Sequence, residues 1–225
     1  MLNLKQNKDL HLSNHAVVQV GRTSRNRGFT LVELLVTISM FVIITGVVLV
    51  NSNKFDSTVL LHNFAYDVAL TIKQAQTYGV NAKESSSGTF NTAYGVYFDL
   101  IQNNTNFVLF NDIAGLNGQG NPNLIYDGSL TSCPTDSLEC IQKYSMTKGT
   151  RIQSICAGAS DAGCQFVDRL SILFKRPNLG ALIYSVDSIG SPSSPQSYAK
   201  IILAAQDGAT STVVVTSIGQ IYIKK

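Results

Sequence analysis

The apolar positions of this chain follow three successive patterns, of which the first is an almost unbroken apolar run. Residues 29–50 are interrupted only by Glu33, a few hydroxyl side chains and Gly46. About 20 apolar residues are enough for a helix to cross a bilayer. The run is therefore predicted to be a transmembrane helix.

From Phe55 onward the pattern becomes amphipathic, with apolar side chains at steps of three or four residues: Leu61, Phe64, Ala65, Val68, Ile72 and Ala75. We expect the same helix to continue through this stripe and to end near Gly79. A single helix from about Phe29 to Tyr78 would be about 75 Å long at 1.5 Å per residue. Its first half needs lipid or other helices around it, and its second half needs a domain on which to lie.

Beyond residue 80 the period shortens to runs of aromatic and β-branched residues that are divided by turn residues. The strands expected from these runs are 94–101, 106–110, 124–126, 141–146, 151–155, 170–174, 181–186, 199–205, 211–216 and 220–224. The clearest hairpin turns at Asp207-Gly208. The predicted fold class is α+β, a long N-terminal helix packed on one antiparallel, β-rich head formed by residues 81–225.

The positive charge of the chain is concentrated at its N-terminus. The chain has 17 basic and 14 acidic side chains, and residues 1–28 hold five of the basic and one of the acidic. The remaining 12 basic and 13 acidic side chains leave the rest of the chain close to neutral. A neutral remainder offers no general electrostatic footprint for nucleic acid.

The basic residues directly before the apolar run predict its orientation. Arg22, Arg25 and Arg27 hold that end in the cytoplasm under the positive-inside rule, so residues beyond the run are exported. A plain signal anchor is one interpretation of this arrangement. An ordinary secretory signal, however, is cleaved after its apolar stretch, whereas the plausible processing point here, Gly28, lies before it. The apolar stretch would then be retained.

Glu33 is the one charge inside the membrane-grade segment. An ionisable side chain at that depth costs about 2.5–3.5 kcal/mol and is usually functional, with a partner that compensates it. It lies one helical turn from the new N-terminus at Phe29, too deep, we expect, to cap its own helix.

Four cysteines, Cys133, Cys140, Cys156 and Cys164, lie in the exported part. Export to an oxidising compartment favours disulfides, and four cysteines permit three pairings. The spacings of seven and eight residues favour two local loops, Cys133–Cys140 and Cys156–Cys164. Zinc is the alternative, but neither pair has the usual two-to-four-residue gap and His62 is the only exported histidine.

Other chemistry has little support in the sequence. Four residues could supply oxygen ligands to calcium (Asp112, Asn117, Asn121 and Asp127), but they lack the spacing of a calcium loop, which favours a solvated Asn/Gly loop. No catalytic constellation is present, because His62 has no carboxylate–nucleophile pairing and the serines lack a strand–turn–helix elbow. We expect no enzyme activity, no cofactor, no bound metal and no small-molecule substrate.

The junction between the basic segment and the apolar run is the most specific feature of the chain. Its residues, Arg25, Arg27, Gly28, Phe29, Thr30, Leu31, Val32, Glu33, Leu34 and Leu35, resemble the prepilin leader of type IV pilins and type II secretion pseudopilins. The resemblance covers about 25 residues. It implies that a prepilin peptidase cuts between Gly28 and Phe29 and methylates the new amine, so that residues 1–28 form a cleaved leader. Residues 29–50 would then hold the subunit in the inner membrane until an assembly platform extracts it.

The same resemblance implies that Glu33 pairs with the N-terminal amine of a neighbouring pilin-like subunit. Tyr94-Gly95-Val96, residues 107–112, residues 174–177 and the final hairpin are more loosely similar to GspH/FimT-type minor subunits. The chain departs from common major pilins in having no proline in the membrane half and no disulfide loop at its extreme C-terminus. We therefore expect a minor, tip-associated subunit of a secretion pseudopilus. The alternative is a type IV pilus tip protein that binds DNA or a surface through clustered basic residues. The further partners considered are a secreted protein and DNA.

Overall fold

The computed structural model describes residues 28–224 except 82, 85–87, 89–91, 114–121 and 134–138, and gives only the backbone of residues 50–56. Of the segments expected from the sequence, the leader up to residue 27 lies outside the described residues. The chain divides into two compact units, with the boundary between Val47 and Val48, and each is described by itself.

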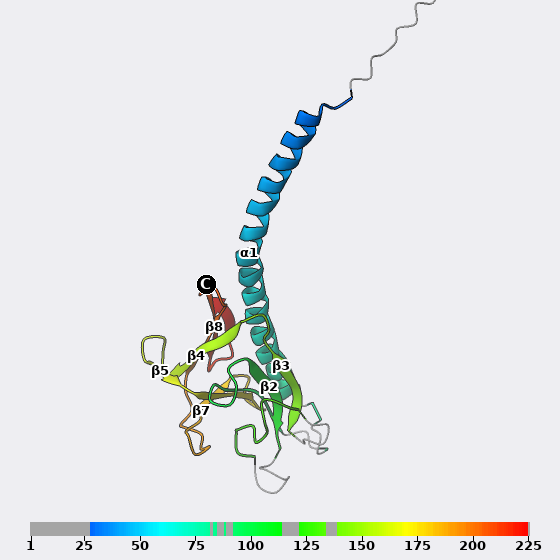
Figure 1. Cartoon of the computed structure of the whole chain (residues 1–225). Helices are drawn as coiled ribbons and strands as arrows, with labels where there is room; N and C mark the ends of the chain where they lie inside the picture. The colour runs from blue at the N-terminus through cyan, green and yellow to red at the C-terminus, as the bar shows by residue number, and fades with distance from the viewer. Residues whose placement is uncertain are drawn as a thin grey trace, which may run out of the picture. The chain divides into compact units, whose positions relative to one another are not determined.

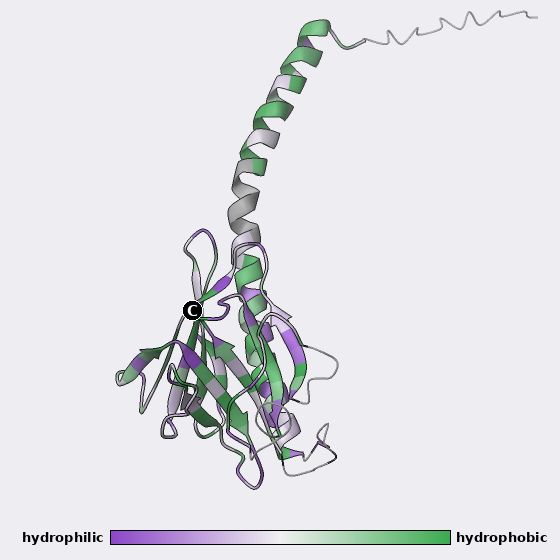
Figure 2. Ribbon diagram, turned by 60° about the horizontal axis from the view of Figure 1, so that its bottom comes forward, coloured by the Kyte–Doolittle hydropathy of each residue, from purple (hydrophilic) through white to green (hydrophobic). Residues whose placement is uncertain are grey.

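Helix α1, Leu31–Val80, is a single helix of 50 residues. Its first part, Leu31–Leu49, is long and apolar enough to cross a membrane, and none of its residues is buried. At 1.5 Å per residue this part spans about 28 Å, close to the hydrocarbon thickness of a bilayer. Figure 2 shows the hydrophobic colour prevailing along it.

Among the residues that the structure describes, the second unit contains ten strands in two five-stranded sheets, and every strand pair is antiparallel. The first sheet has the order β3-β2-β1-β6-β7, and its strands are β1 (Ala93–Asp99), β2 (Asn106–Asp112), β3 (Cys140–Ser145), β6 (Arg169–Phe174) and β7 (Leu182–Ser185). The second has the order β10-β9-β8-β4-β5, with β4 (Arg151–Gly158), β5 (Cys164–Val167), β8 (Tyr198–Ala204), β9 (Thr210–Thr216) and β10 (Ile221–Lys224). Several of these strands are labelled in Figure 1. The α+β class with a long N-terminal helix and an antiparallel β-rich head is confirmed.

The stripe predicted on the second half of α1 lies in the main core. Leu61, Ala65, Val68, Ile72 and Ala75 are all buried and pack in one cluster with residues from both sheets. Val96 and Ile172 enter this cluster from the first sheet, and Ile201, Val213 and Val215 enter it from the second. The strands therefore lie in two sheets around one core.

The first sheet is covered on both faces, which explains why β1 and β2 are buried along their whole length. Its second face packs against Ile125, Tyr126 and Leu130, none of which belongs to a strand. The strand expected at 124–126 was therefore wrong. Its apolar side chains lie on a sheet, and the Leu124 carbonyl accepts a hydrogen bond from Ser171 Oγ at 2.7 Å. Strand β5 was not expected at all.

The helix ends near Gly79, as expected, but Gly79 is not the residue that stops it. The helix passes through Gly79 and ends at Val80, whose carbonyl accepts a hydrogen bond from Arg176 Nε at 2.7 Å. A side-chain carbon at Gly79 would collide with the carbonyl of Phe174 at the end of β6. Glycine is needed here because the helix and strand backbones approach closely, and not to stop the helix.

Candidate functional site

Gly28 and Phe29 lie just before α1, outside its helical hydrogen bonds. A side-chain carbon added at Gly28 would meet no other atom within 4 Å, and the Phe29 side chain is 79% exposed. The peptide bond between them is therefore accessible from solvent in the structure.

Thr30 caps the start of the helix. Its carbonyl accepts the first helical hydrogen bond from Leu34 N at 3.1 Å, and its Oγ1 accepts a second from Glu33 N at 3.2 Å. Threonine at the cap and glutamate three residues later form the sequence of a capping box. Sequence reasoning missed this cap, to which Glu33 contributes its backbone N–H. Glu33 lies in the first turn of the helix, where a negative charge interacts favourably with the helix dipole. The Thr-x-x-Glu spacing was the signal that could have revealed this.

The other polar side chains of the apolar segment are satisfied within the helix. Thr37 Oγ1 donates to the Leu34 carbonyl at 2.9 Å, and Ser39 Oγ donates to that of Val36 at 2.8 Å. Thr45 Oγ1 donates to the Phe41 carbonyl at 2.7 Å. Since these hydroxyls need nothing from outside, Glu33 is the side chain in this segment that would require a partner in an apolar environment.

The four cysteines form two pairs in the structure, Cys133–Cys140 and Cys156–Cys164, with Cα–Cα distances of 5.6 and 5.5 Å. Cys156 lies in β4 and Cys164 in its antiparallel neighbour β5, so this bridge fastens an edge strand. The other bridge fastens the segment before β3 to the first residue of that strand. Within the part of the chain that the structure describes, no group of three or more His, Cys, Asp or Glu side chains could hold a metal ion.

Two of the residues considered for calcium, Asp112 and Asp127, lie in a cluster with Glu139, which sequence reasoning missed; Asp112 and Glu139 are buried and Asp127 is half-buried. Asn117 and Asn121 are outside the described residues. The Asp112 carboxylate accepts backbone N–H groups from Asn123 (3.0 Å) and Leu124 (3.1 Å), and Glu139 Oε2 accepts that of Asp127 (3.0 Å). Burial raises the pKa of Glu139 to about 7, and the neighbouring carboxylates of Asp127 and Asp112 add to the rise. Burial also raises the pKa of Asp112, against the effect of its two backbone donors and of Lys175. The cluster holds the segment that covers the first sheet.

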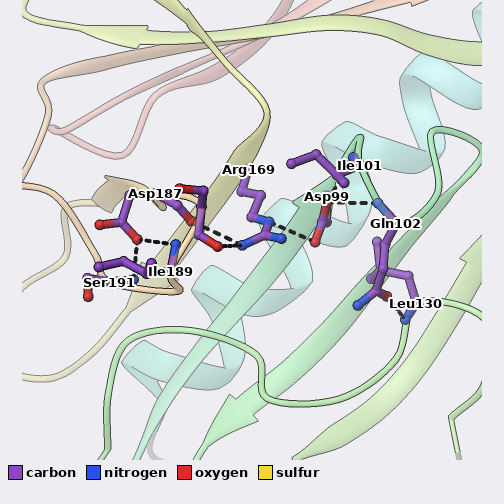
Figure 3. A network of polar contacts seen from close by, with 9 residues as sticks. Asp99, Ile101, Gln102, Leu130, Arg169, Asp187, Ile189 and Ser191 are labelled. Atoms are coloured by element: carbon purple, nitrogen blue, oxygen red, sulfur yellow. Dashed lines mark hydrogen bonds and ion pairs between the residues drawn. The ribbon is translucent and has the colours of Figure 1, made fainter.

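A second polar network joins two turns of the head (Figure 3). Asp99 at the end of β1 is 3% exposed at its side chain and forms an ion pair with Arg169, with Nε and Oδ2 3.0 Å apart. Asp99 Oδ1 accepts the backbone N–H groups of Ile101 and Gln102, while the Arg169 guanidinium donates to the Asp187 carbonyl at 3.0 Å. Asp187 Oδ1 in turn accepts the N–H groups of Ile189 and Ser191. These bonds stabilise the turns, and they provide the partners that the buried Asp99–Arg169 pair needs.

A family model described as the prokaryotic N-terminal methylation motif matches residues 23–49. No curated protein and no solved structure matches the chain. The matched segment contains Gly28, Phe29 and Glu33 together with the first part of α1. The match supports a type IV pilin-like structural subunit. It implies processing by a prepilin peptidase, assembly with other pilins and membrane anchoring through the apolar helix.

Proposed function

We propose that the chain is a minor, tip-associated subunit of a type II secretion pseudopilus or type IV pilus, of the GspH/FimT type. Residues 1–28 form the cleaved leader, residues 29–80 the assembly helix and residues 81–225 the head. The observation that carries the proposal is an accessible Gly28–Phe29 bond directly before a 19-residue apolar helix, inside the matched motif.

In this proposal the peptidase cuts after Gly28 at the cytoplasmic face and methylates the amine of Phe29. Residues 29–50 then anchor the subunit once across the bacterial inner membrane, with the head in the periplasm. The assembly platform transfers the subunit from lipid into a bundle of pilin-like helices, driven by an ATPase. The side chains of Leu31–Leu49, which lie unburied in the single chain, are covered in both environments.

Glu33 is proposed to pair with the N-terminal amine of a neighbouring subunit. Inside an apolar bundle an unpaired carboxylate is costly, and a cation offsets the cost only where the two groups meet. Since a shift of either helix along its axis separates them, the pair favours one axial register. The hydroxyls of the segment cannot supply this selectivity, because their donors are already bonded within the helix.

The DNA-binding alternative needs free basic side chains on the head, and several basic side chains of the head are engaged locally. Lys143 Nζ donates to the Thr131 carbonyl at 2.8 Å, and Arg176 donates to the end of α1. Lys200 and Lys224 both form ion pairs with Asp161. These contacts favour the structural role over nucleic-acid binding.

The test is incorporation of Glu33→Gln into fibres, measured against the amount of cleaved, membrane-inserted subunit in the same cells. Glutamine keeps the capping box but removes the charge, so cleavage and insertion should be unchanged. Incorporation should fall about tenfold or more, the scale expected for breaking a buried pair. Thr37→Val is the matched control, because it removes a hydroxyl that is bonded within the same helix and should not alter incorporation. Normal incorporation of Glu33→Gln would refute the pairing.

A further inference from the structure

In the first described residues of the chain, helix α1 begins close to the bond that is proposed to be cut. We propose that Thr30 is a positioning residue, which ends α1 before Phe29 and so keeps the Gly28–Phe29 peptide extended for the peptidase. This inference rests on the proposed function, in which that bond is hydrolysed.

Two residues, Phe29 and Thr30, separate the bond from the helix. Helix α1 begins at Leu31, and both cap interactions of Thr30, through its carbonyl and its Oγ1, are formed. Phe29 and Leu34 also occupy the positions of the apolar pair that flanks a capping box. The sequence therefore specifies where the helix starts, and the start falls just after the scissile bond.

An extended bond matters because hydrolysis adds water across it. The water oxygen attacks the Gly28 carbonyl carbon and stays in the new carboxyl group, the C–N bond breaks, and a proton goes to the Phe29 amine. If the helix extended through Phe29, the carbonyls of Gly28 and Phe29 would accept hydrogen bonds from N–H groups four residues later. The Gly28–Phe29 peptide bond would then lie within the first turn of the helix. A peptidase would then have to unwind a turn before reaching the carbonyl.

Loss of the Thr30 hydroxyl should lengthen the helix and not fray it. Without Oγ1, the Glu33 N–H needs another acceptor, and the acceptor four residues earlier is the carbonyl of Phe29. At a membrane, an unsatisfied N–H group costs several kcal/mol, so the bond to Phe29 is preferred to an open end. The extended form of Gly28–Phe29 then becomes a minor state.

The experiment compares cleavage of the full-length precursor, Thr30→Val and Thr30→Ser by a purified prepilin peptidase in detergent. Valine keeps the shape and removes the acceptor, whereas serine keeps the acceptor. We expect Thr30→Val to raise KM about fivefold, the factor that corresponds to about 1 kcal/mol of cap, with kcat unchanged. An unfavourable pre-equilibrium in the substrate lowers apparent affinity in this way. Thr30→Ser should restore the wild-type KM.

A second readout does not depend on cleavage. Backbone carbon shifts of Phe29 and residue 30 in micelles should be non-helical in the wild type and Thr30→Ser, and helical in Thr30→Val. If Thr30→Val is cut with the wild-type KM, or keeps residues 29–30 extended, the positioning role is wrong while the proposed processing stands. If the wild-type precursor is not cut at Gly28, the proposed function fails, and the shifts alone decide whether Thr30 sets the helix start.

Discussion

Residues 31–49 and the strands of the head place similar apolar side chains in opposite surroundings. Along the first part of α1 no residue is buried, although leucine, isoleucine, valine and phenylalanine dominate it. In the head, β1 and β2 are buried from end to end, and the stripe from Leu61 to Ala75 is closed over by both sheets. The head therefore satisfies its apolar surface within one chain, whereas the N-terminal segment requires lipid or other subunits.

The acidic residues of the two regions differ in the same way. Asp99 is buried with Arg169 and two backbone N–H groups from its own chain. Glu33 lies on an exposed helix start, where it takes part only in a capping sequence. We infer that the head carries its own counter-charges and that the segment obtains one on assembly.

The largest expected effect is on processing. Gly28→Leu should leave nearly all of the subunit as uncleaved precursor, because the peptidase requires a small residue with a permissive backbone at that position. A side chain there meets no atom within 4 Å, so the folded chain itself should be unaffected. Immunoblots of membranes would measure the ratio of precursor to mature protein, with Gly28→Ala as the small-residue control. Efficient maturation of Gly28→Leu would contradict cleavage at this bond.

Arg169→Leu should destabilise the head by about 3–5 kcal/mol, because it leaves Asp99 buried without its cation. The matched control is Lys200→Leu. Its cation is 21% exposed, against 20% for Arg169, but its partner Asp161 is 48% exposed, against 3% for Asp99. We expect Lys200→Leu to lower the free energy of unfolding by at most about 1 kcal/mol. Denaturant unfolding of the full-length protein in detergent measures both, and equal losses would show that burial of the carboxylate does not matter.

Removal of the Cys156–Cys164 bridge by a double change to alanine should cost about 2–3 kcal/mol, because its loop is short. The loss should loosen β5 without affecting cleavage at Gly28, since the two regions are built independently. Peptide mapping without reductant should link Cys156 to Cys164 and Cys133 to Cys140. A crossed pairing in protein from the periplasm would overturn this arrangement.

A further expected effect is a pH dependence of the stability of the head. The pKa of Glu139 rises from about 4.5 to about 7 on folding, so the folded head binds more protons than the unfolded chain between these values. Its contribution to stability is therefore complete below about pH 4.5 and is lost as the pH rises to about 7. Asp112, whose pKa is also raised, acts in the same direction.

Glu139→Gln should reduce this loss of stability with rising pH. Thermal unfolding of the wild type and the variant across pH 4–8 measures the difference between the two slopes. Equal slopes would show that Glu139 does not titrate in this range.

The sequence was enough to predict the helix, its apolar and amphipathic halves, and most strands. These features depend on local periodicity, as the buried positions Leu61, Val68 and Ile72 show. The hairpin at Asp207-Gly208 was predicted for the same reason, because turn chemistry is local.

Features that depend on distant contacts were missed. Gly79 is required by the backbone of Phe174, and Asp99 finds its partner in Arg169, in each case across a long stretch of sequence. The division into two sheets follows from which strands pair, and residues 124–126 cover a sheet instead of joining one. In the N-terminal site, Glu33 was recognised by its charge, whereas the cap at Thr30 was overlooked although its spacing is local.

The central claim is that the apolar segment of residues 29–50, which is not covered within its own chain, is kept in the mature protein. The mature protein then begins at Phe29. The most direct test is the intact mass of the protein from cells that carry the assembly machine, together with the sequence of its N-terminal peptide. The account predicts a mature chain that starts with N-methyl-phenylalanine at Phe29 and retains residues 29–50. Recovery of the chain from Met1 alone, or a mature form that starts beyond residue 50, would contradict it.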